Sequence, residues 1–257
     1  MAEWTTTEEA PLTAETLQAV FNNKIPVLRI RDFCTPEECQ TFLKAFEKGR
    51  VQYYKLAPVG YIGTAQVEYR WGNQKGEYFE AAEQAWKDWH EVIDDAWDPL
   101  ERLIKVLADV TGKSVGLAEE PGFGRLFAGI IRKASKGIGR HSDFAPFNAP
   151  DYSIGQIDAQ LGWNLFFDVP GTGGVTHVYN RPWTVELREG EDPPMSYGLG
   201  DEVIAGAQST SYSAMAGDVV LFNSRNPHEV TPGEGGDRIQ IGSFIGRQKD
   251  GSLVLWS

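Results

Sequence analysis

Hydrophobic residues in the first 120 positions recur mainly at the spacing that one face of a helix requires. The segment Thr35-Pro36-Glu37-Glu38 is a capping box with proline at the first helical position. The pattern predicts helices over about 12–21, 36–49, 77–97 and 98–111, a strand over 24–33, and a short hairpin with a loop over 51–76. We therefore expect residues 1–120 to be mostly helical.

After Pro121 the pattern changes to short apolar runs that Gly, Pro and Asn interrupt. These runs are rich in Val, Ile, Phe and Tyr, which is typical of strands. They predict strands over 125–133, 137–142, 160–168, 174–180, 209–215, 217–223, 237–246 and 252–256. Seven or eight strands without helices between them indicate an antiparallel sandwich or barrel. We expect the two longer connections, 143–159 and 181–208, to form loops over its mouth.

Composition and length fit one globular domain over residues 1–257. The chain is 41% hydrophobic and 23% charged, and it shows no internal repeat or low-complexity linker. We expect the helical part, 1–120, to buttress a β-rich core over 121–257. A formal net charge of −12 argues against nucleic acid or an anionic membrane as the main partner. No apolar run approaches the roughly 18 residues that a membrane span needs.

The two cysteines and the N-terminus indicate the cellular compartment of the protein. Cys34 and Cys39 lie at the start of a predicted helix without a histidine-rich neighbourhood. Two ligands do not close a zinc site, so we interpret them as reduced core thiols. The polar, acidic N-terminus has neither a signal-peptide nor a transit-peptide pattern. We expect a cytoplasmic protein, and the sequence leaves its oligomeric state open.

Candidate chemistry is concentrated in the four histidines. His141 and Asp143 are two residues apart at the end of a predicted strand, so their side chains point the same way. His228 follows a later predicted strand. Two histidines and one carboxylate on one face of a metal are typical of non-haem iron oxygenases. With four histidines, however, a His-x-Asp triplet arises by chance in roughly a quarter of sequences. We interpret His90 and His177 as structural or surface residues.

Arg238 strengthens this interpretation. It lies ten residues after His228, at the start of the predicted strand DRIQIGSFIG. A buried arginine at such a place needs an anion, because an unpaired buried charge is costly. The planar guanidinium suits a carboxylate.

Together, His141-Ser142-Asp143, His228 and Arg238 resemble the motif of the iron(II)/2-oxoglutarate-dependent oxygenases. The resemblance implies a double-stranded β-helix, that is a cupin-like jelly-roll barrel of the α+β class, mainly β, with helices outside it. It implies that His141, Asp143 and His228 bind Fe(II) and that Arg238 binds the distal carboxylate of 2-oxoglutarate. It also implies oxidation of a small-molecule substrate with O₂, giving succinate and CO₂.

Three segments extend the likeness to one subgroup: GTGGVTHVYNRPW (171–183), VVLFNSRNPHEV (219–230) and GSLVLWS (251–257). They resemble free-standing aliphatic halogenases, whose relatives hydroxylate amino acids or N-acylated amino acids. Halogenases of this group have Gly or Ala in place of the metal-binding carboxylate, which leaves room for chloride. Because Asp143 is retained, we expect hydroxylation of an unactivated aliphatic carbon in an amino-acid-like or natural-product molecule. Alternatives are desaturation or cyclisation of the same substrates, halogenation, and a non-enzymatic metal-binding jelly-roll module.

Two segments are candidates for substrate contacts. The first is the connection after Asp143, which contains Phe144, Phe147 and Tyr152. The second contains Arg70 and Trp71, and it resembles a substrate-lining region of the subgroup. Arg70 could pair with a substrate carboxylate, although a surface position is equally compatible with its sequence context.

Overall fold

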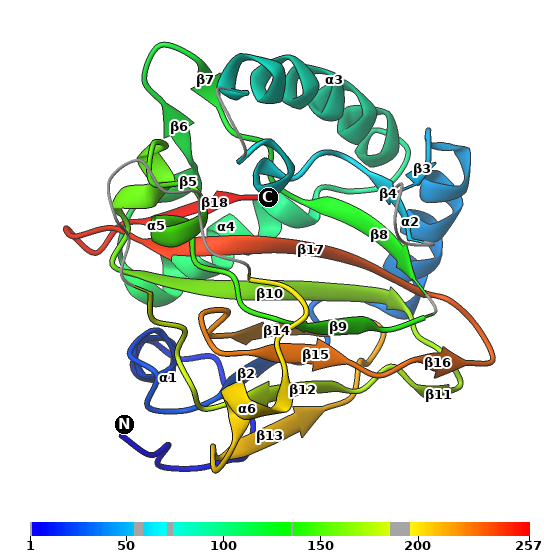
Figure 1. The fold of residues 1–257 in the computed structure, drawn as a ribbon. Coiled ribbons are helices and arrows are strands. Elements are labelled where there is room, and N and C mark those ends of the chain that lie inside the picture. The colour runs from blue at the N-terminus through cyan, green and yellow to red at the C-terminus, as the bar shows by residue number, and fades with distance from the viewer. Residues whose placement is uncertain (1, 54–58, 71–73, 135, 186–195) are drawn as a thin grey trace.

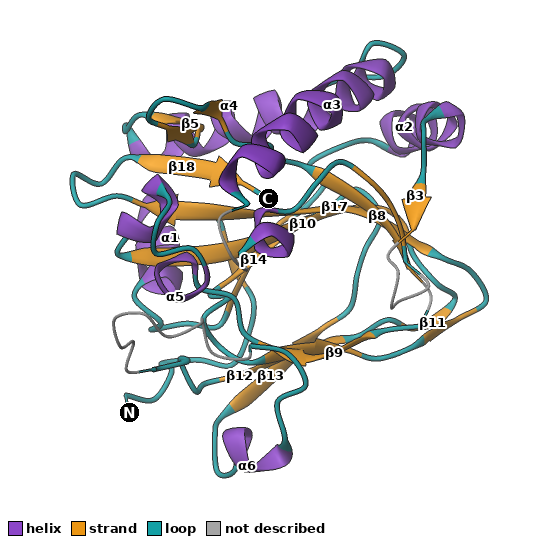
Figure 2. Ribbon diagram, turned by 45° about the horizontal axis from the view of Figure 1, so that its top comes forward, coloured by secondary structure: helices purple, strands orange, loops and turns teal. Residues whose placement is uncertain are grey.

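Two β-sheets that face each other form the centre of the molecule (Figures 1 and 2). The computed structural model describes residues 2–53, 59–70, 74–134, 136–185 and 196–257. Within these residues no strand of one large sheet pairs with a strand of the other, so the two sheets form an open jelly roll, not a closed barrel. The predicted mainly β jelly roll with outer helices is confirmed.

Among the described residues the main sheet has ten strands. Eight follow one another in the spatial order β1 (Ala10–Pro11), β2 (Val27–Ile30), β14 (Val219–Phe222), β10 (Ala159–Asp168), β17 (Arg238–Arg247), β8 (Ile130–Ala134), β4 (Gly60–Ile62) and β3 (Gln52–Tyr53). In addition, β18 (Leu253–Trp256) pairs with the second half of β17, and β5 (Val115–Leu117) pairs with β18.

In the described part of the chain the smaller sheet has four strands, in the order β13 (Ser209–Tyr212), β12 (Thr176–Tyr179), β15 (His228–Val230) and β9 (Ile138–His141). Two short ribbons complete the strands: β11 (Thr172–Gly173) with β16 (Gly233–Glu234), and β6 (Glu119–Glu120) with β7 (Gly124–Arg125).

Four of the helices that the structure describes lie outside the main sheet (Figure 2). They are α1 (Ala14–Phe21), α2 (Pro36–Lys48), α3 (Lys75–Ile93) and α4 (Pro99–Thr111). The predicted capping box at α2 is present, since Thr35 and Glu38 exchange both hydrogen bonds. The Phe42 ring of α2 stacks on Phe167 of β10, with ring centroids 3.8 Å apart. The large hydrophobic core therefore lies between the helices and this sheet, and it also contains the buried residues Cys34 and Cys39.

The alternation along β17 gives the main sheet two different faces. Ile239, Ile241 and Ile245 belong to the core under the helices. Arg238 and Gln240 have the opposite parity, so they point toward the smaller sheet. One strand therefore supplies both a hydrophobic anchor and a polar wall for the space between the sheets.

Several predicted boundaries were wrong. The predicted strand 125–133 is two strands, β7 and β8, because Gly129 adopts φ +90° against the Trp89 ring. The connection 143–159 was expected to be a loop, but it holds α5 (Ala145–Asn148) and the 3₁₀ helix η2 (Ser153–Gln156). The first 120 residues also supply strands β1–β6 beside their helices, because β2, β4 and β5 pair with strands from the second half of the chain.

Candidate metal centre

His141 and His228 are brought together by the pairing of neighbouring strands. They are directly opposite each other in the antiparallel ladder between β9 and β15. Asp143 follows β9, and its backbone is fixed at both polar groups: its N–H donates to the carbonyl of Ser224 at 2.8 Å, and its carbonyl accepts from the Ser224 hydroxyl at 3.1 Å. The local His-x-Asp spacing and one long-range strand pair thus assemble three side chains.

The three side chains form a compact and buried ligand set. One ligand atom from each of His141, Asp143 and His228 lies within 4.8 Å of the others. The Oδ2 atom of Asp143 is 3.6 Å from Nε2 of His141 and 3.8 Å from Nε2 of His228. These separations leave room for one cation that all three atoms bind.

Hydrogen bonds on the far side of each ring fit the same conclusion. Nδ1 of His141 is 2.8 Å from the Gly139 carbonyl, and Nδ1 of His228 is 2.9 Å from the Asn226 carbonyl. A carbonyl only accepts, so each Nδ1 carries a proton and each Nε2 presents its lone pair to the centre. This donor set, two neutral imidazoles and a carboxylate, is the one that non-haem iron binds.

Burial changes the pKa values of two of the three ligands, His228 and Asp143. It lowers the pKa of His228 well below the ordinary range, so the imidazole stays neutral and available as a ligand. Burial also raises the pKa of Asp143, while His141, Arg132 and Arg70 oppose that rise. A divalent cation would compensate the buried carboxylate directly.

Aromatic rings hold both imidazoles in place. Tyr197 stacks on His141 with ring centroids 4.4 Å apart and planes at 8°. Phe222 meets His228 edge-on at 4.8 Å. Tyr197 is not among the residues predicted from the sequence; it lies in the long connection 181–208 and joins β9 through a single β-bridge to His141. No local motif marks such a residue.

Arg238 lies at the start of β17, buried between the sheets. Its guanidinium is 6.0 Å from the Phe166 ring, and it has no ion-pair partner among the residues that the structure describes. Burial lowers its pKa to about 10. A small cavity of 10 Å³ adjoins it, lined in part by Ala134 and Gly137. An anion bound beside such an arginine would offset the cost of burying its charge.

Arg132 and Gln240 extend the polar wall beside Arg238. Gln240 donates to the Asn164 side chain at 3.0 Å, and Arg132 donates to the Gly242 carbonyl at 3.1 Å. The charge of Arg132 acts on both Asp143 and Arg238. Neither Arg132 nor Gln240 is among the site residues predicted from the sequence. The alternation R-I-Q-I-G in β17 could have indicated Gln240.

The proposed substrate residues lie in different surroundings. Arg70, at the end of the 3₁₀ helix η1 (Gln66–Tyr69), is half-buried and interacts electrostatically with Asp143 and Tyr197. Phe144 and Phe147 meet edge to face at 5.0 Å, just after Asp143. Arg70 is therefore near the metal ligands in space, and Phe144 and Phe147 are near them in sequence.

Tyr152 points elsewhere. It belongs to the core under the helices, where its ring lies 6.0 Å from Tyr78 and 4.5 Å below the Lys75 ammonium. Trp71 lies outside the described residues. A substrate role for these residues stays a prediction. Within the described residues, no helix is long and apolar enough to span a membrane.

Two curated proteins are similar to this chain over most of its length. Leucinostatins biosynthesis cluster protein S of Purpureocillium lilacinum is 33% identical over 215 residues, covering 78% of this chain and 86% of that protein. The L-gamma-glutamyl-L-propargylglycine hydroxylase of Streptantibioticus cattleyicolor is 28% identical over 265 residues, covering 97% and 95%.

Solved structures share the fold. An N-substituted L-amino acid dioxygenase from Burkholderia ambifaria aligns with a TM-score of 0.64 at 15% identity, covering 96% of this chain and 92% of that one. HygX from Streptomyces hygroscopicus, solved with nickel and 2-oxoglutarate, aligns with a TM-score of 0.53 at 15% identity, covering 91% and 87%. The family model described as carrier-protein-independent halogenase WelO5 matches residues 5–257. The chain therefore belongs to the WelO5 family of carrier-protein-independent halogenases.

Proposed function

We propose that this protein is an Fe(II)/2-oxoglutarate-dependent oxygenase that hydroxylates an aliphatic carbon of an amino-acid-like or natural-product molecule. The observation that carries the proposal is the buried cluster of His141, Asp143 and His228, with ligand atoms within 4.8 Å of one another. The curated hydroxylase relative and the amino acid dioxygenase with the same fold support the reaction and the substrate class.

In this proposal the three ligands hold the iron and Arg238 holds the distal carboxylate of 2-oxoglutarate. Bound iron, with 2-oxoglutarate and O₂, supplies the oxidising power to break an unactivated C–H bond, giving succinate and CO₂. The Nδ1 hydrogen bonds orient His141 and His228, and Tyr197 and Phe222 keep the two rings from turning. The site is buried, which excludes water from the oxidant.

Halogenation is the second candidate, and family membership favours it. Asp143 argues against it, because its carboxylate occupies the position that a chloride ligand would take. Desaturation or cyclisation of the same substrates needs the same residues, so product analysis must separate it from hydroxylation.

Two further expectations belong to the same proposal. Residues 1–257 form one domain, which the shared core of the helices and both halves of the main sheet supports. The protein works in the cytoplasm, which its two buried free thiols support.

The first test is anaerobic addition of Fe(II) and 2-oxoglutarate, which should give a weak visible charge-transfer band. His228→Gln should abolish the band. The matched control is His177→Gln, which changes a histidine of β12 outside the ligand set and should retain it.

The second test is a panel of free and N-acylated amino acids, with succinate and the product mass as readouts. A product 16 mass units heavier than the substrate is expected, in step with succinate. Absence of the band in the wild-type protein would refute the oxygenase metal centre and support the non-enzymatic module. A band without any oxidised product would mean that the substrate lies outside the panel.

A further inference from the structure

The outer face of the smaller sheet carries a cluster of paired polar residues behind the metal ligands. Arg140 and Glu229 are the chain neighbours of His141 and His228, on β9 and β15. Because neighbouring strand residues point to opposite faces, the side chains of Arg140 and Glu229 lie on the face away from the metal centre. They meet across the two strands, where Nη2 of Arg140 donates to Oε1 of Glu229 at 3.0 Å.

The ladder between β9 and β15 is irregular at this place. Between the pair His141–His228 and the next pair along the ladder, β9 has two residues and β15 has one. Gly139 and Arg140 therefore stand opposite Glu229, which is the arrangement of a β-bulge. A bulge disrupts the regular hydrogen bonds of the ladder, so its shape depends on other contacts.

The bulge is in direct contact with a metal ligand. The Gly139 carbonyl accepts a hydrogen bond from Nδ1 of His141 at 2.8 Å. Such a hydrogen bond sets the direction in which an imidazole presents its other nitrogen to a metal. A change in the shape of the bulge would therefore move Nε2 of His141.

Several contacts hold the Arg140 side chain in one place. It is 12% exposed, and its Nη1 donates to Asp201 of α6 (Asp201–Ile204) at 2.8 Å. Its guanidinium lies 5.2 Å from the centre of the Tyr179 ring of β12, and the Tyr179 hydroxyl donates to the same Glu229 oxygen at 2.5 Å. A pair with these additional contacts is held more firmly than an isolated ion pair on an exposed surface.

Arg140 also anchors the segment that contributes a ring to His141. Its backbone carbonyl accepts from the N–H of Leu199 at 3.1 Å, and its side chain reaches Asp201 two residues later. Tyr197, which stacks on the His141 imidazole, lies two residues before Leu199. One residue thus connects the bulge beside His141 with the ring that stacks on it.

We propose that Arg140 is a positioning residue of the metal centre: its pair with Glu229 fixes the bulge in β9, and the bulge orients the His141 imidazole toward the metal. This inference rests on the proposed function, because it assumes that the three ligands bind a divalent cation. Both side chains of the pair act from the opposite face of the sheet and do not touch that cation.

Charge alone predicts the opposite effect of removing Arg140. A guanidinium on the residue next to a metal ligand repels a cation, so its removal should by charge alone tighten metal binding. Loss of the orienting pair should instead weaken metal binding. The direction of the change therefore separates positioning from simple electrostatics.

The test uses Co(II) as the probe, because its visible absorption bands depend on the geometry of the ligands. Titration of the metal-free protein gives the dissociation constant. Arg140→Met should bind Co(II) about tenfold more weakly than the wild type, which is the low end of the range for groups that support metal-bound histidines. Its absorption bands should also change, because His141 is no longer held in its original orientation.

Three more variants separate the contributions. Arg140→Lys can still pair with Glu229 and should recover most of the affinity. The double variant Arg140→Met, Glu229→Gln leaves the local net charge unchanged and should still bind about tenfold more weakly. Tyr179→Phe keeps the ring and removes only the hydroxyl that donates to Glu229, so it tests the proposal even if the other variants fold poorly. It should weaken Co(II) binding in the same direction by a smaller factor.

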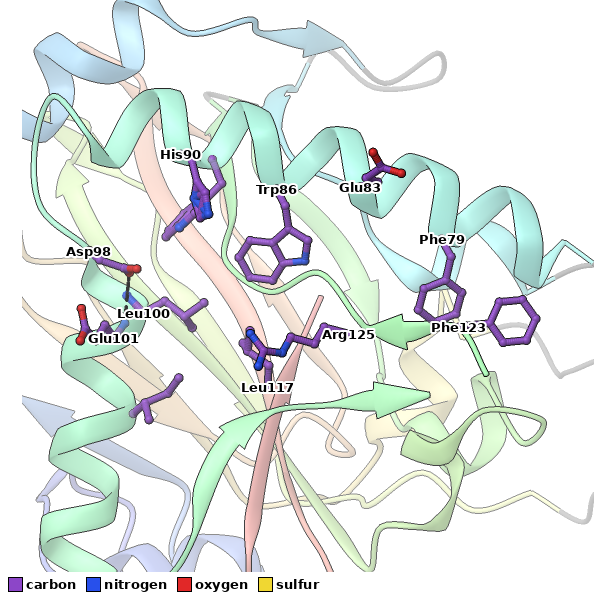
Figure 3. Close-up of a pocket in the computed structure, with 12 residues that line it drawn as sticks. Phe79, Glu83, Trp86, His90, Asp98, Leu100, Glu101, Leu117, Phe123 and Arg125 are labelled. Atoms are coloured by element: carbon purple, nitrogen blue, oxygen red, sulfur yellow. Dashed lines mark hydrogen bonds between the residues drawn. The ribbon is translucent and has the colours of Figure 1, made fainter. Parts of the chain in front are cut away.

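Two arginines outside this cluster serve as controls. Arg247 of β17 pairs with Asp158 at 2.8 Å and is 17% exposed, so Arg247→Met removes a comparably shielded guanidinium. Arg125 pairs with Glu119 at 3.2 Å and lines a cavity of 580 Å³ between α3 and α4 (Figure 3). The described residues that line this cavity include no metal ligand. Arg247→Met and Arg125→Met should both keep the Co(II) affinity and the absorption bands of the wild type.

The outcomes distinguish this proposal from the proposed function. Co(II) binding by Arg140→Met that equals or exceeds that of the wild type would overturn the positioning role alone. An equal loss of affinity in Arg247→Met would also overturn it, because general destabilisation would then explain both results. If the wild-type protein binds no Co(II), the metal centre of the proposed function fails, and the positioning role fails with it. No step of the test measures turnover.

Discussion

Replacing Arg238 with methionine should make the 2-oxoglutarate-free protein more stable. Burial lowers the pKa of Arg238 from its ordinary value to about 10. A tenfold change in an acid dissociation constant corresponds to about 1.4 kcal/mol, so the buried charge costs about 3 kcal/mol. Arg238 is protonated in both the folded and the unfolded chain at neutral pH, so the whole cost is present there and decreases only as pH rises above about 10.

Arg238→Met keeps most of the side-chain volume and removes the charge. Replacing buried charges by apolar groups stabilises proteins by about 1–4 kcal/mol in comparable cases. We expect the free energy of unfolding to rise by about 1–3 kcal/mol, measured by urea unfolding of the zinc-loaded protein without 2-oxoglutarate. Arg125→Met is the control, since its side chain is 68% exposed and should change stability by less than about 0.5 kcal/mol.

Addition of 2-oxoglutarate should remove most or all of the stability advantage of the methionine variant. At one hundred times its dissociation constant the ligand adds about 2.7 kcal/mol to the stability of the wild-type protein. The methionine variant should gain almost nothing, because it lacks the group that holds the distal carboxylate. A lower stability of Arg238→Met than of the wild type without 2-oxoglutarate would refute the prediction, and so would an equal gain in stability of both proteins from 2-oxoglutarate.

Three further changes test other parts of the molecule. Asp143→Gly should lose the hydroxylated product and yield chlorinated product in chloride buffer; mass spectrometry that finds no chlorination would show that an open ligand position is insufficient. Arg29→Ala should cost about 3–5 kcal/mol in urea unfolding, because it leaves Asp218, 3.0 Å from the guanidinium, buried without its cation; a loss below 1 kcal/mol would contradict this. The Arg102 guanidinium lowers the pKa of Glu38 to about 2. Glu38→Gln should cost about 1 kcal/mol at pH 7, since the pair is partly exposed. That cost should disappear as pH falls from about 4.5 to about 2, and a loss independent of pH would assign it to the capping box alone.

The sequence revealed the parts of the site that depend on local geometry. His141 and Asp143 share a side of the chain because strand residues alternate, and this parity is visible in three letters. The proximity of His228 is different, because it comes from the pairing of β15 with β9 across 87 positions. Only the resemblance to a known motif indicated that His228 lies beside His141 and Asp143.

The unpredicted features depend on contacts between distant segments. The strands β2, β4 and β5 extend the main sheet because β14, β8 and β18 offer them free edges, and sequence patterns do not encode such partners. Tyr197 reaches His141 from a long connection for the same reason. The helix boundaries were easier, because the capping box and Asp98 fix them locally.

The two faces of β17 show how the fold accommodates a buried charge that lowers its stability. Its isoleucines pack under the helices, where each buried side chain contributes roughly 1.5–3 kcal/mol. Its other face carries Arg238 and Gln240, which need partners that the folded chain only partly supplies. Successive residues of one strand face opposite sides of the sheet. The hydrophobic face can therefore stabilise the strand while the polar face provides groups that bind a ligand. Selection for binding and selection for folding therefore act on alternate residues of the same ten-residue strand.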